Sequence, residues 1–223
     1  MRRRPASLPL SVNVEIFADV VCPWCYLGQA RFTKALAAYG KPVSVTWRPF
    51  QLDPSAPLEA TPADPYLALK FGGPDKVVAA HARLRPLATA EGLPYEPEQA
   101  LRINSARAHR VIALAGEHGV QDAVAARLFR AHHAEGRDLG DPSTLGSLAA
   151  SEGLPAEEVQ DLLAGDKGVA ELDAQLARAQ ALGITGVPFF LFEETWGVSG
   201  AQSVEVLEGA LREVEGRLIS PAG

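Results

Sequence analysis

The sequence predicts an α/β fold in which two strand-and-helix regions are separated by a long helical segment. β-branched and apolar residues mark strands over 12–20 and 43–47, and an apolar strand returns over 187–192. From residue 65 to about residue 163 the chain shows only helical patterns. Because strands and helices alternate at both ends of the chain, the simplest arrangement is one sheet-containing domain split by helices.

The first region is predicted to be a strand, a helix and a second strand. The strand over 12–20 ends just before Cys-Pro-Trp-Cys at 22–25, and a helix follows over 26–39. Gly40 closes this helix, and the second strand covers 43–47. A helix that connects neighbouring strands of one sheet makes them parallel, so we expect a βαβ unit.

The middle of the chain begins with residues 51–65, which hold four prolines and no sustained periodicity. We therefore expect a linker there. Helix signals follow at 75–91 (with a kink at Pro86), from residue 104 or 105, at 121–135, from Asp141-Pro142 and from Leu154-Pro155.

The last region contains a helix from residue 166, the strand over 187–192, a tight turn and a short hairpin strand. A final helix carries apolar residues at heptad spacing and is expected to face the core. The predicted domain organisation is a first sheet-containing part (11–54), a helical insertion (55–165) and a second sheet-containing part (166–218).

The composition excludes some classes of function. The 223 residues carry a formal net charge of −6, which argues against a nucleic-acid-binding surface. No segment approaches the roughly 18 apolar residues of a membrane span. Arg2–Arg4 precede the short, proline-broken stretch Leu8-Pro9-Leu10, which does not make a secretory signal. We expect a cytoplasmic protein with a frayed N-terminus and without nucleic-acid or membrane partners. The sequence carries no signal for the oligomeric state.

Both cysteines of the chain lie in one motif, Cys22-Pro23-Trp24-Cys25. A disulfide that closes so short a loop stabilises a fold very little. A structural zinc site needs about four ligands, and the sequence has no second cysteine pair. Thiol–disulfide exchange is the best remaining explanation, and no cofactor or metal is expected.

The four residues of the motif are predicted to have different roles. Cys22 lies where a strand ends and a helix begins, so the helix dipole and unpaired N–H groups favour its thiolate and make it the nucleophile. Cys25, one turn further on, is expected to be more buried and to resolve the mixed disulfide. Pro23 pre-sets the first helical turn. Trp24 gives the substrate a flat apolar surface beside the sulfur.

Other polar residues are weaker candidates. Asp19 is a candidate for proton transfer with Cys25; the alternative is a turn residue at the end of a strand. His132 and His133 are metal-ligand types, but adjacent residues face different ways on a helix, so no metal site is expected. For His109 we expect a surface position or a structural role with its hydrogen bonds satisfied.

Four segments in order along the chain carry a resemblance to a known family. They are Phe17–Gly28 around the cysteines, Asn104–Arg110, Gly183–Phe190 and Val198–Gln202. Together they resemble the FrnE branch of the DsbA-like thiol–disulfide oxidoreductases. This resemblance implies a thioredoxin fold interrupted by an all-helical insertion domain, and substrates that are proteins or low-molecular-weight thiols and disulfides.

The resemblance also implies positions for Val187 and Pro188. Pro188 would follow a cis peptide bond beside the two sulfurs, and Val187 would offer backbone groups to an extended substrate. Strongly oxidising relatives have a histidine between the cysteines where this chain has Pro-Trp, so their oxidising strength is not carried over. The additional cysteines of some FrnE relatives are absent, which leaves no second disulfide relay.

Two other functions remain open. One is a glutathione-dependent enzyme like the kappa-class transferases or 2-hydroxychromene-2-carboxylate isomerases, which share the split fold. That branch has serine at the position of Cys22 and Trp-Gly-x-Asp-Arg after the hairpin, whereas Trp196-Gly197 here precede Val198-Ser199. The other is a non-catalytic binding module. Whether the dithiol oxidises, reduces or isomerises depends on its reduction potential, although a cytoplasmic location favours reduction or repair.

Overall fold

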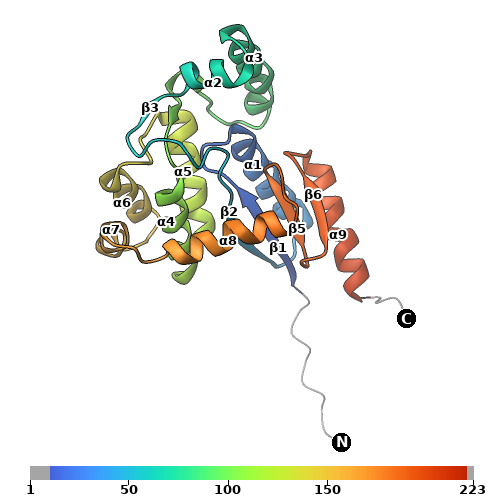
Figure 1. Ribbon diagram of the computed structural model, residues 1–223. Coiled ribbons are helices and arrows are strands. Elements are labelled where there is room, and N and C mark those ends of the chain that lie inside the picture. Colours follow the sequence, from blue (N-terminus) through green and yellow to red (C-terminus); the bar gives the residue numbers. More distant parts are fainter. Residues whose placement is uncertain (1–10, 220–223) are drawn as a thin grey trace, which may run out of the picture.

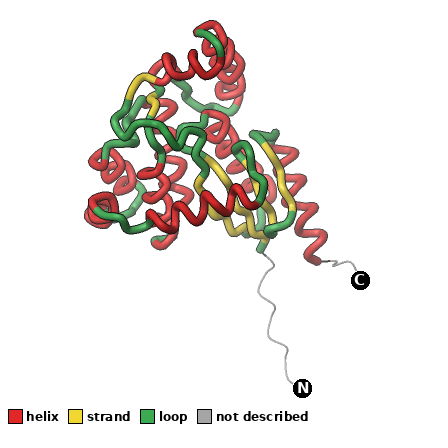
Figure 2. Tube along the Cα trace, viewed as in Figure 1, coloured by secondary structure: helices red, strands yellow, loops and turns green. Residues whose placement is uncertain are grey.

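A four-stranded sheet forms the centre of the computed structural model, which describes residues 11–219 (Figures 1 and 2). In the order β2-β1-β5-β6, β1 (Val12–Ala18) lies between β2 (Val43–Pro49) and β5 (Phe189–Phe192), and β6 (Trp196–Ser199) is at the edge. β1 is parallel to β2, to which α1 (Pro23–Tyr39) connects it, and antiparallel to β5. The predicted βαβ unit and the C-terminal hairpin are confirmed.

Strand β1 is buried on both faces because its successive side chains enter different layers. Val14 and Ile16 belong to the core that also contains buried residues of α1 and of α9 (Val204–Ile219). Phe17 packs with residues of β5 and of α8 (Val169–Ala181). Helices α1 and α9 therefore cover one face of the sheet, and α8 crosses the other, as Figure 1 shows.

The segment between β2 and β5 is mostly helical, as expected. Its helices are α2 (Ala63–Phe71), α3 (Pro74–Ala90), α4 (Ala106–Glu117), α5 (Gln121–Glu135), α6 (Pro142–Ser151) and α7 (Ala156–Ala164), with a 3₁₀ turn at Pro97–Gln99. It is not all-helical: β3 (Thr61–Pro62) pairs antiparallel with β4 (Leu101–Arg102). Two residues per strand are too few to produce a periodic pattern, so this ribbon could not be predicted from the sequence.

Residues 51–65 are not the free linker that their prolines suggested. The backbone N–H of Leu52 donates to the Asp19 carboxylate at 2.8 Å, and the N–H of Asn104 donates to the carbonyl oxygen of Pro57 at 2.8 Å. The segment is thus fixed to the end of β1 and to the start of α4. The exact domain boundaries stay a prediction.

The ends of two elements differ from the prediction. β1 stops at Ala18, two residues early, because the chain turns at once and the N–H of Cys22 donates to the carbonyl oxygen of Asp19 at 3.0 Å. Helix α1 begins at Pro23, inside the motif. The N-terminal arginines, for which we expected fraying, lie outside the described residues. Across residues 11–219, no helix combines the length and apolar character that a membrane crossing requires.

Glu15 ties the α8 side of the sheet together. Its carboxylate pairs with Arg178 of α8 and Arg48 of β2, each at 2.5 Å. Burial raises the pKa of Glu15, but the hydrogen bonds from both arginines outweigh burial and hold the pKa below its ordinary value. The ionised carboxylate therefore stabilises the folded state above the unfolded pKa, and this contribution is lost as the pH falls through the folded pKa.

We predict that Glu15→Gln lowers the free energy of unfolding by about 1–3 kcal/mol at neutral pH, because two arginines lose their partner. The difference from wild type should shrink as the pH falls below about 4.3, the ordinary pKa of a glutamate, and then through the lower pKa of folded Glu15. Urea denaturation over a pH series measures both effects. As a control, Glu213→Gln breaks an exposed pair with Arg217 and should change stability by less than about 0.5 kcal/mol. A loss that is independent of pH would contradict this account.

Candidate active site

The turn after β1 places Cys22 at the start of α1. Cys22 is the N-cap residue, with extended backbone angles (φ −89°, ψ 114°), and Pro23 is the first helical residue. The carbonyl oxygen of Cys22 accepts hydrogen bonds from the N–H groups of Cys25 at 3.0 Å and Tyr26 at 3.2 Å. The Cys22 sulfur is therefore beside the positive end of the helix dipole.

The loop before β5 approaches this sulfur. The thiol of Cys22 donates to the carbonyl oxygen of Val187 at 3.8 Å, and the Val187–Pro188 peptide bond is cis. The Pro188 ring packs on α1 at Gly28, where a Cβ atom would lie only 2.7 Å from the proline Cγ. Residues far apart in the sequence thus meet beside the nucleophile candidate, in the arrangement that the family resemblance implied.

Cys25 is placed differently from Cys22. Both are free thiols, but Cys25 is completely inaccessible to solvent. Burial raises the pKa of the Cys25 thiol well above its usual range, and hydrogen bonding with Cys22 and the charge of Cys22 raise it further. Cys25 is thus held as a neutral thiol one turn inside the helix.

Asp19 lies beside Cys25 and is also fully buried. Its Oδ2 accepts the N–H of Leu52 at 2.8 Å, and its Oδ1 accepts the N–H of Val21 at 3.4 Å. The backbone N–H of Asp19 hydrogen-bonds the Cys25 sulfur and lowers the Cys25 pKa, whereas the Asp19 carboxylate charge raises it. The Asp19 carboxylate is thus near enough to Cys25 for its charge to act on the thiol, and Asp19 remains a candidate for proton transfer.

His109 also belongs to this site, and the expected surface position is wrong. Its side chain is 4% exposed, and Nε2 lies 3.4 Å from Asp19 Oδ1 and 3.0 Å from the carbonyl oxygen of Phe50. One ring nitrogen, Nε2, has hydrogen-bond partners, as the structural alternative expected. Nothing local in the sequence pairs a residue of α4 with the end of β1; only the fold brings them together.

The two adjacent histidines of α5 are both buried, and their rings meet edge to face with 4.7 Å between centroids. Nε2 of His133 contacts the carbonyl oxygen of Val20 at 3.0 Å, and its ring stacks on Tyr26 with 5.3 Å between centroids. His132 Nδ1 is buried without a hydrogen-bond partner among the described residues. Burial lowers the pKa of His132 to about 4, so this histidine is neutral at neutral pH. His133 holds the turn that carries Cys22.

A cavity of about 240 Å³ opens beside Cys22. Pro23 and Trp24 line it from the motif, and Lys70 and Arg102 add positive charge. Most of its remaining wall is apolar or aromatic and comes from the insertion: Ala56, Ala63, Tyr66, Leu67, Phe71, Leu84, Tyr95, Pro97, Leu101 and Ile103. The cavity therefore offers an apolar binding surface directly beside Cys22.

Comparison with known proteins identifies the family of this fold and site. Residues 13–212 match the model of the DSBA-like thioredoxin domain. The chain belongs to this family. A probable DsbA oxidoreductase from Streptomyces coelicolor is 38% identical, with a TM-score of 0.86 over 92% of this chain and 90% of that chain.

Two more distant structures share the DSBA-like fold. A 2-hydroxychromene-2-carboxylate isomerase is 18% identical, with a TM-score of 0.72 over 95% of this chain and all of that one. The cytosolic disulfide reductase DsbM from Pseudomonas aeruginosa, solved with GSH, is 20% identical, with a TM-score of 0.63 over 93% of this chain and 98% of that one. One fold therefore serves different chemistries in this group of proteins.

The space around two helical glycines, Gly28 and Gly146, predicts that replacing each with alanine changes the free energy of unfolding in opposite directions. Gly28→Ala should lower the free energy of unfolding by about 1–3 kcal/mol, because its methyl group overlaps the proline ring. Gly146→Ala in α6 has open space around the new methyl group and should raise it by about 0.5–1 kcal/mol. Chemical denaturation measures both; a stabilised Gly28→Ala variant would contradict the close packing.

The different burial of the two thiols predicts their order of alkylation. Iodoacetamide at mildly acid pH should label Cys22 first in the reduced protein, because the raised pKa of Cys25 leaves little of its reactive thiolate. Peptide mass mapping after a short exposure distinguishes the two sites. Preferential labelling of Cys25 would show that the nucleophile is misassigned.

Proposed function

We propose that this protein is a thiol–disulfide oxidoreductase that exchanges disulfides through Cys22 and Cys25. The observation that supports this most is the pairing of two unlike thiols: Cys22 at the first turn of α1 beside a cavity, and Cys25 buried behind it. A thiolate that attacks and a second thiol that resolves are the two groups that disulfide exchange requires.

The exchange has two steps. The Cys22 thiolate attacks a substrate disulfide, forms a mixed disulfide and releases one substrate sulfur as a thiolate. Cys25 then loses its proton to Asp19, and its thiolate attacks the Cys22 sulfur. The mixed disulfide breaks, the second substrate sulfur leaves with the bonding electron pair, and the substrate has gained two electrons. The same steps in reverse oxidise a substrate dithiol.

The substrate-binding residues are those that surround Cys22. Trp24 and Pro23 line the apolar cavity, and the Val187 carbonyl oxygen lies 3.8 Å from the Cys22 sulfur. We propose that an extended substrate pairs with the backbone of Val187 while its neighbouring side chains enter the cavity. Pro188 has no N–H that could compete for the thiolate at this point.

The substrates are proposed to be proteins or low-molecular-weight disulfides, and the direction to be reduction in the cytoplasm. The similarity to DsbM, a cytosolic disulfide reductase solved with GSH, favours this direction. The segments quoted from the sequence favour the FrnE branch of the family. A titration against a series of glutathione redox buffers measures the potential that decides between reductase, oxidase and isomerase.

A glutathione-dependent isomerase or transferase is the alternative enzyme, because a 2-hydroxychromene-2-carboxylate isomerase shares the fold. The cysteine at position 22 and the missing Asp-Arg after Gly197 argue against it. Reduction of insulin by the protein with dithiothreitol separates these functions: an oxidoreductase accelerates it, whereas the isomerase, the transferase and a binding module do not.

Trapping tests the division of labour between the cysteines. Cys25→Ala keeps the attacking thiol but cannot resolve, so covalent complexes with a disulfide-containing protein should accumulate on a non-reducing gel. Cys22→Ala should form few or none, because the remaining thiol is buried. Equal trapping by both variants would contradict the assigned roles.

A further inference from the structure

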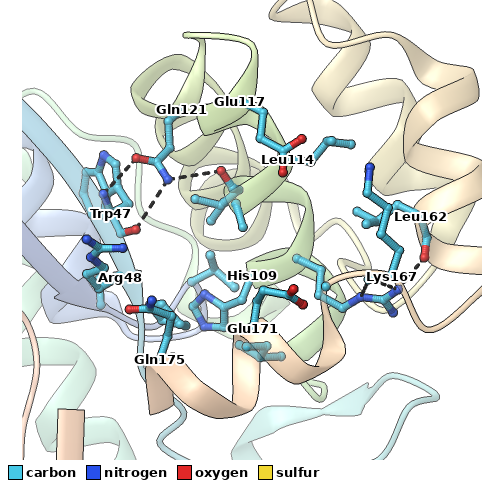
Figure 3. A pocket seen from close by; sticks show the side chains of 18 of the residues that line it. Trp47, Arg48, His109, Leu114, Glu117, Gln121, Leu162, Lys167, Glu171 and Gln175 are labelled. Carbon is cyan, nitrogen blue, oxygen red and sulfur yellow. Dashed lines mark hydrogen bonds between the residues drawn. The ribbon is translucent and has the colours of Figure 1, made fainter. Parts of the chain in front are cut away.

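A second cleft approaches the site from another side. It has a volume of about 270 Å³, lies between β2, α4 and α8, and shares no lining residue with the cavity beside Cys22. Figure 3 shows His109 among the side chains around it, together with Glu117 and Glu171. Both glutamates and Lys167 are exposed to solvent, so the cleft opens at the surface and has room for several water molecules.

His109 separates this cleft from Asp19. Nε2 is directed inward, where it contacts the Phe50 carbonyl oxygen at 3.0 Å and lies 3.4 Å from the Asp19 carboxylate. A contact with a carbonyl oxygen requires a proton on Nε2, because the oxygen can only accept. Nδ1 has no hydrogen-bond partner within residues 11–219 and is the nitrogen left to exchange protons with water in the cleft.

The resolving step creates the need for such a connection. Cys25 must lose its proton while the substrate is bonded to Cys22 and occupies the first cavity, so the substrate closes that route to water. Cys25 and Asp19 are both completely inaccessible to solvent. When Asp19 accepts a proton, a neighbouring group must therefore release one to solvent by a route that the substrate does not block.

We propose that Asp19 and His109 form a buried pair in which Asp19 accepts the Cys25 proton while His109 releases a proton to the water of the second cleft, away from the bound substrate. The proposal rests on the proposed function. His109 acts through Asp19 and is a positioning residue.

Protons and electrons balance in the resolving step. The Cys25 proton passes to Asp19 while Nδ1 of His109 releases a proton to cleft water, and Nε2 keeps its proton on the Phe50 carbonyl oxygen throughout. The Cys25 electron pair forms the bond to Cys22, and the substrate leaves as a thiolate. Reduction of the Cys22–Cys25 disulfide reverses both proton movements and resets the pair.

Several other charged groups surround the pair and bear on its pH dependence. His132 of α5 feels the charge of Asp19, which raises the His132 pKa against the larger effect of burial. Arg110 follows His109 in α4, and its guanidinium donates to the carbonyl oxygens of Leu162, Gly165 and Lys167. The cleft wall adds Arg48, which is paired with Glu15, and the rim adds Glu117, Lys167 and Glu171.

The test follows the two exchange steps separately. Reduced protein is mixed with a symmetric aromatic disulfide whose thiolate is coloured, dithiobis-nitrobenzoate. The first coloured thiolate reports the attack of Cys22, and the second reports resolution by Cys25. His109→Gln retains an N–H donor for the Phe50 carbonyl oxygen but has no proton to exchange.

We expect His109→Gln to leave the first release within about twofold of wild type and to slow the second by roughly 10- to 100-fold, the range of a lost proton-transfer partner. The second release should also lose the pH dependence that His109 gives it in wild type. His118→Gln, which changes a histidine paired with Glu158 at the surface, is the matched control and should behave as wild type.

Chemical rescue distinguishes proton exchange from a purely structural role. In His109→Ala, added imidazole should enter through the second cleft and restore the second release. Pyrazole has the same shape but is a much weaker base, and it should not. The proposal is overturned if His109→Gln resolves at the wild-type rate, if imidazole restores nothing, or if pyrazole restores as much. A wild-type protein that releases no second thiolate would contradict the proposed function itself, and the proposal with it.

Discussion

The burial of β1 between two helical layers is the constraint on which the site depends. Because Phe17 packs toward α8 while Ile16 packs toward α1 and α9, the strand has no freedom to shift its register. Its last residue, Ala18, is therefore a fixed point from which the chain turns into α1. The position of Cys22 at the first turn of that helix follows from where the strand stops.

The turn itself is held by polar contacts from the segment after β2 and from the helical insertion. Leu52 donates to the Asp19 carboxylate, His133 of α5 contacts the Val20 carbonyl oxygen, and His109 of α4 lies against Asp19. Buried polar groups are costly unless they find partners, so these contacts bind the insertion to the end of β1. The insertion is thus part of the site rather than a separate attachment: it supplies both the wall of the cavity and the contacts below the cysteines.

The two faces of the site have opposite character. The cavity beside Cys22 is mostly apolar, which suits substrate side chains, whereas the second cleft is rimmed by charged residues and admits water. Asp19 lies between them without access to either. The proposed substrate binding and the proposed proton exchange would therefore use different sides of the protein.

The sequence by itself determined the parts of this protein that local chemistry specifies. Alternation of apolar residues marked the strands of the sheet, and glycine and proline marked the helix ends. Two cysteines in one motif at a strand–helix junction pointed to exchange chemistry, and the order of the two thiols stays a prediction. The contacts of residues 51–65 could not be predicted, because prolines signal irregular backbone equally well in a free linker and in a segment that is fixed by contacts. The two-residue ribbon of β3 and β4 was too short to leave a pattern. Only the tertiary structure decided that His109 meets Asp19 and that a second cleft lies beside them, because contacts between distant segments depend on how whole layers pack and leave no periodic trace in the chain.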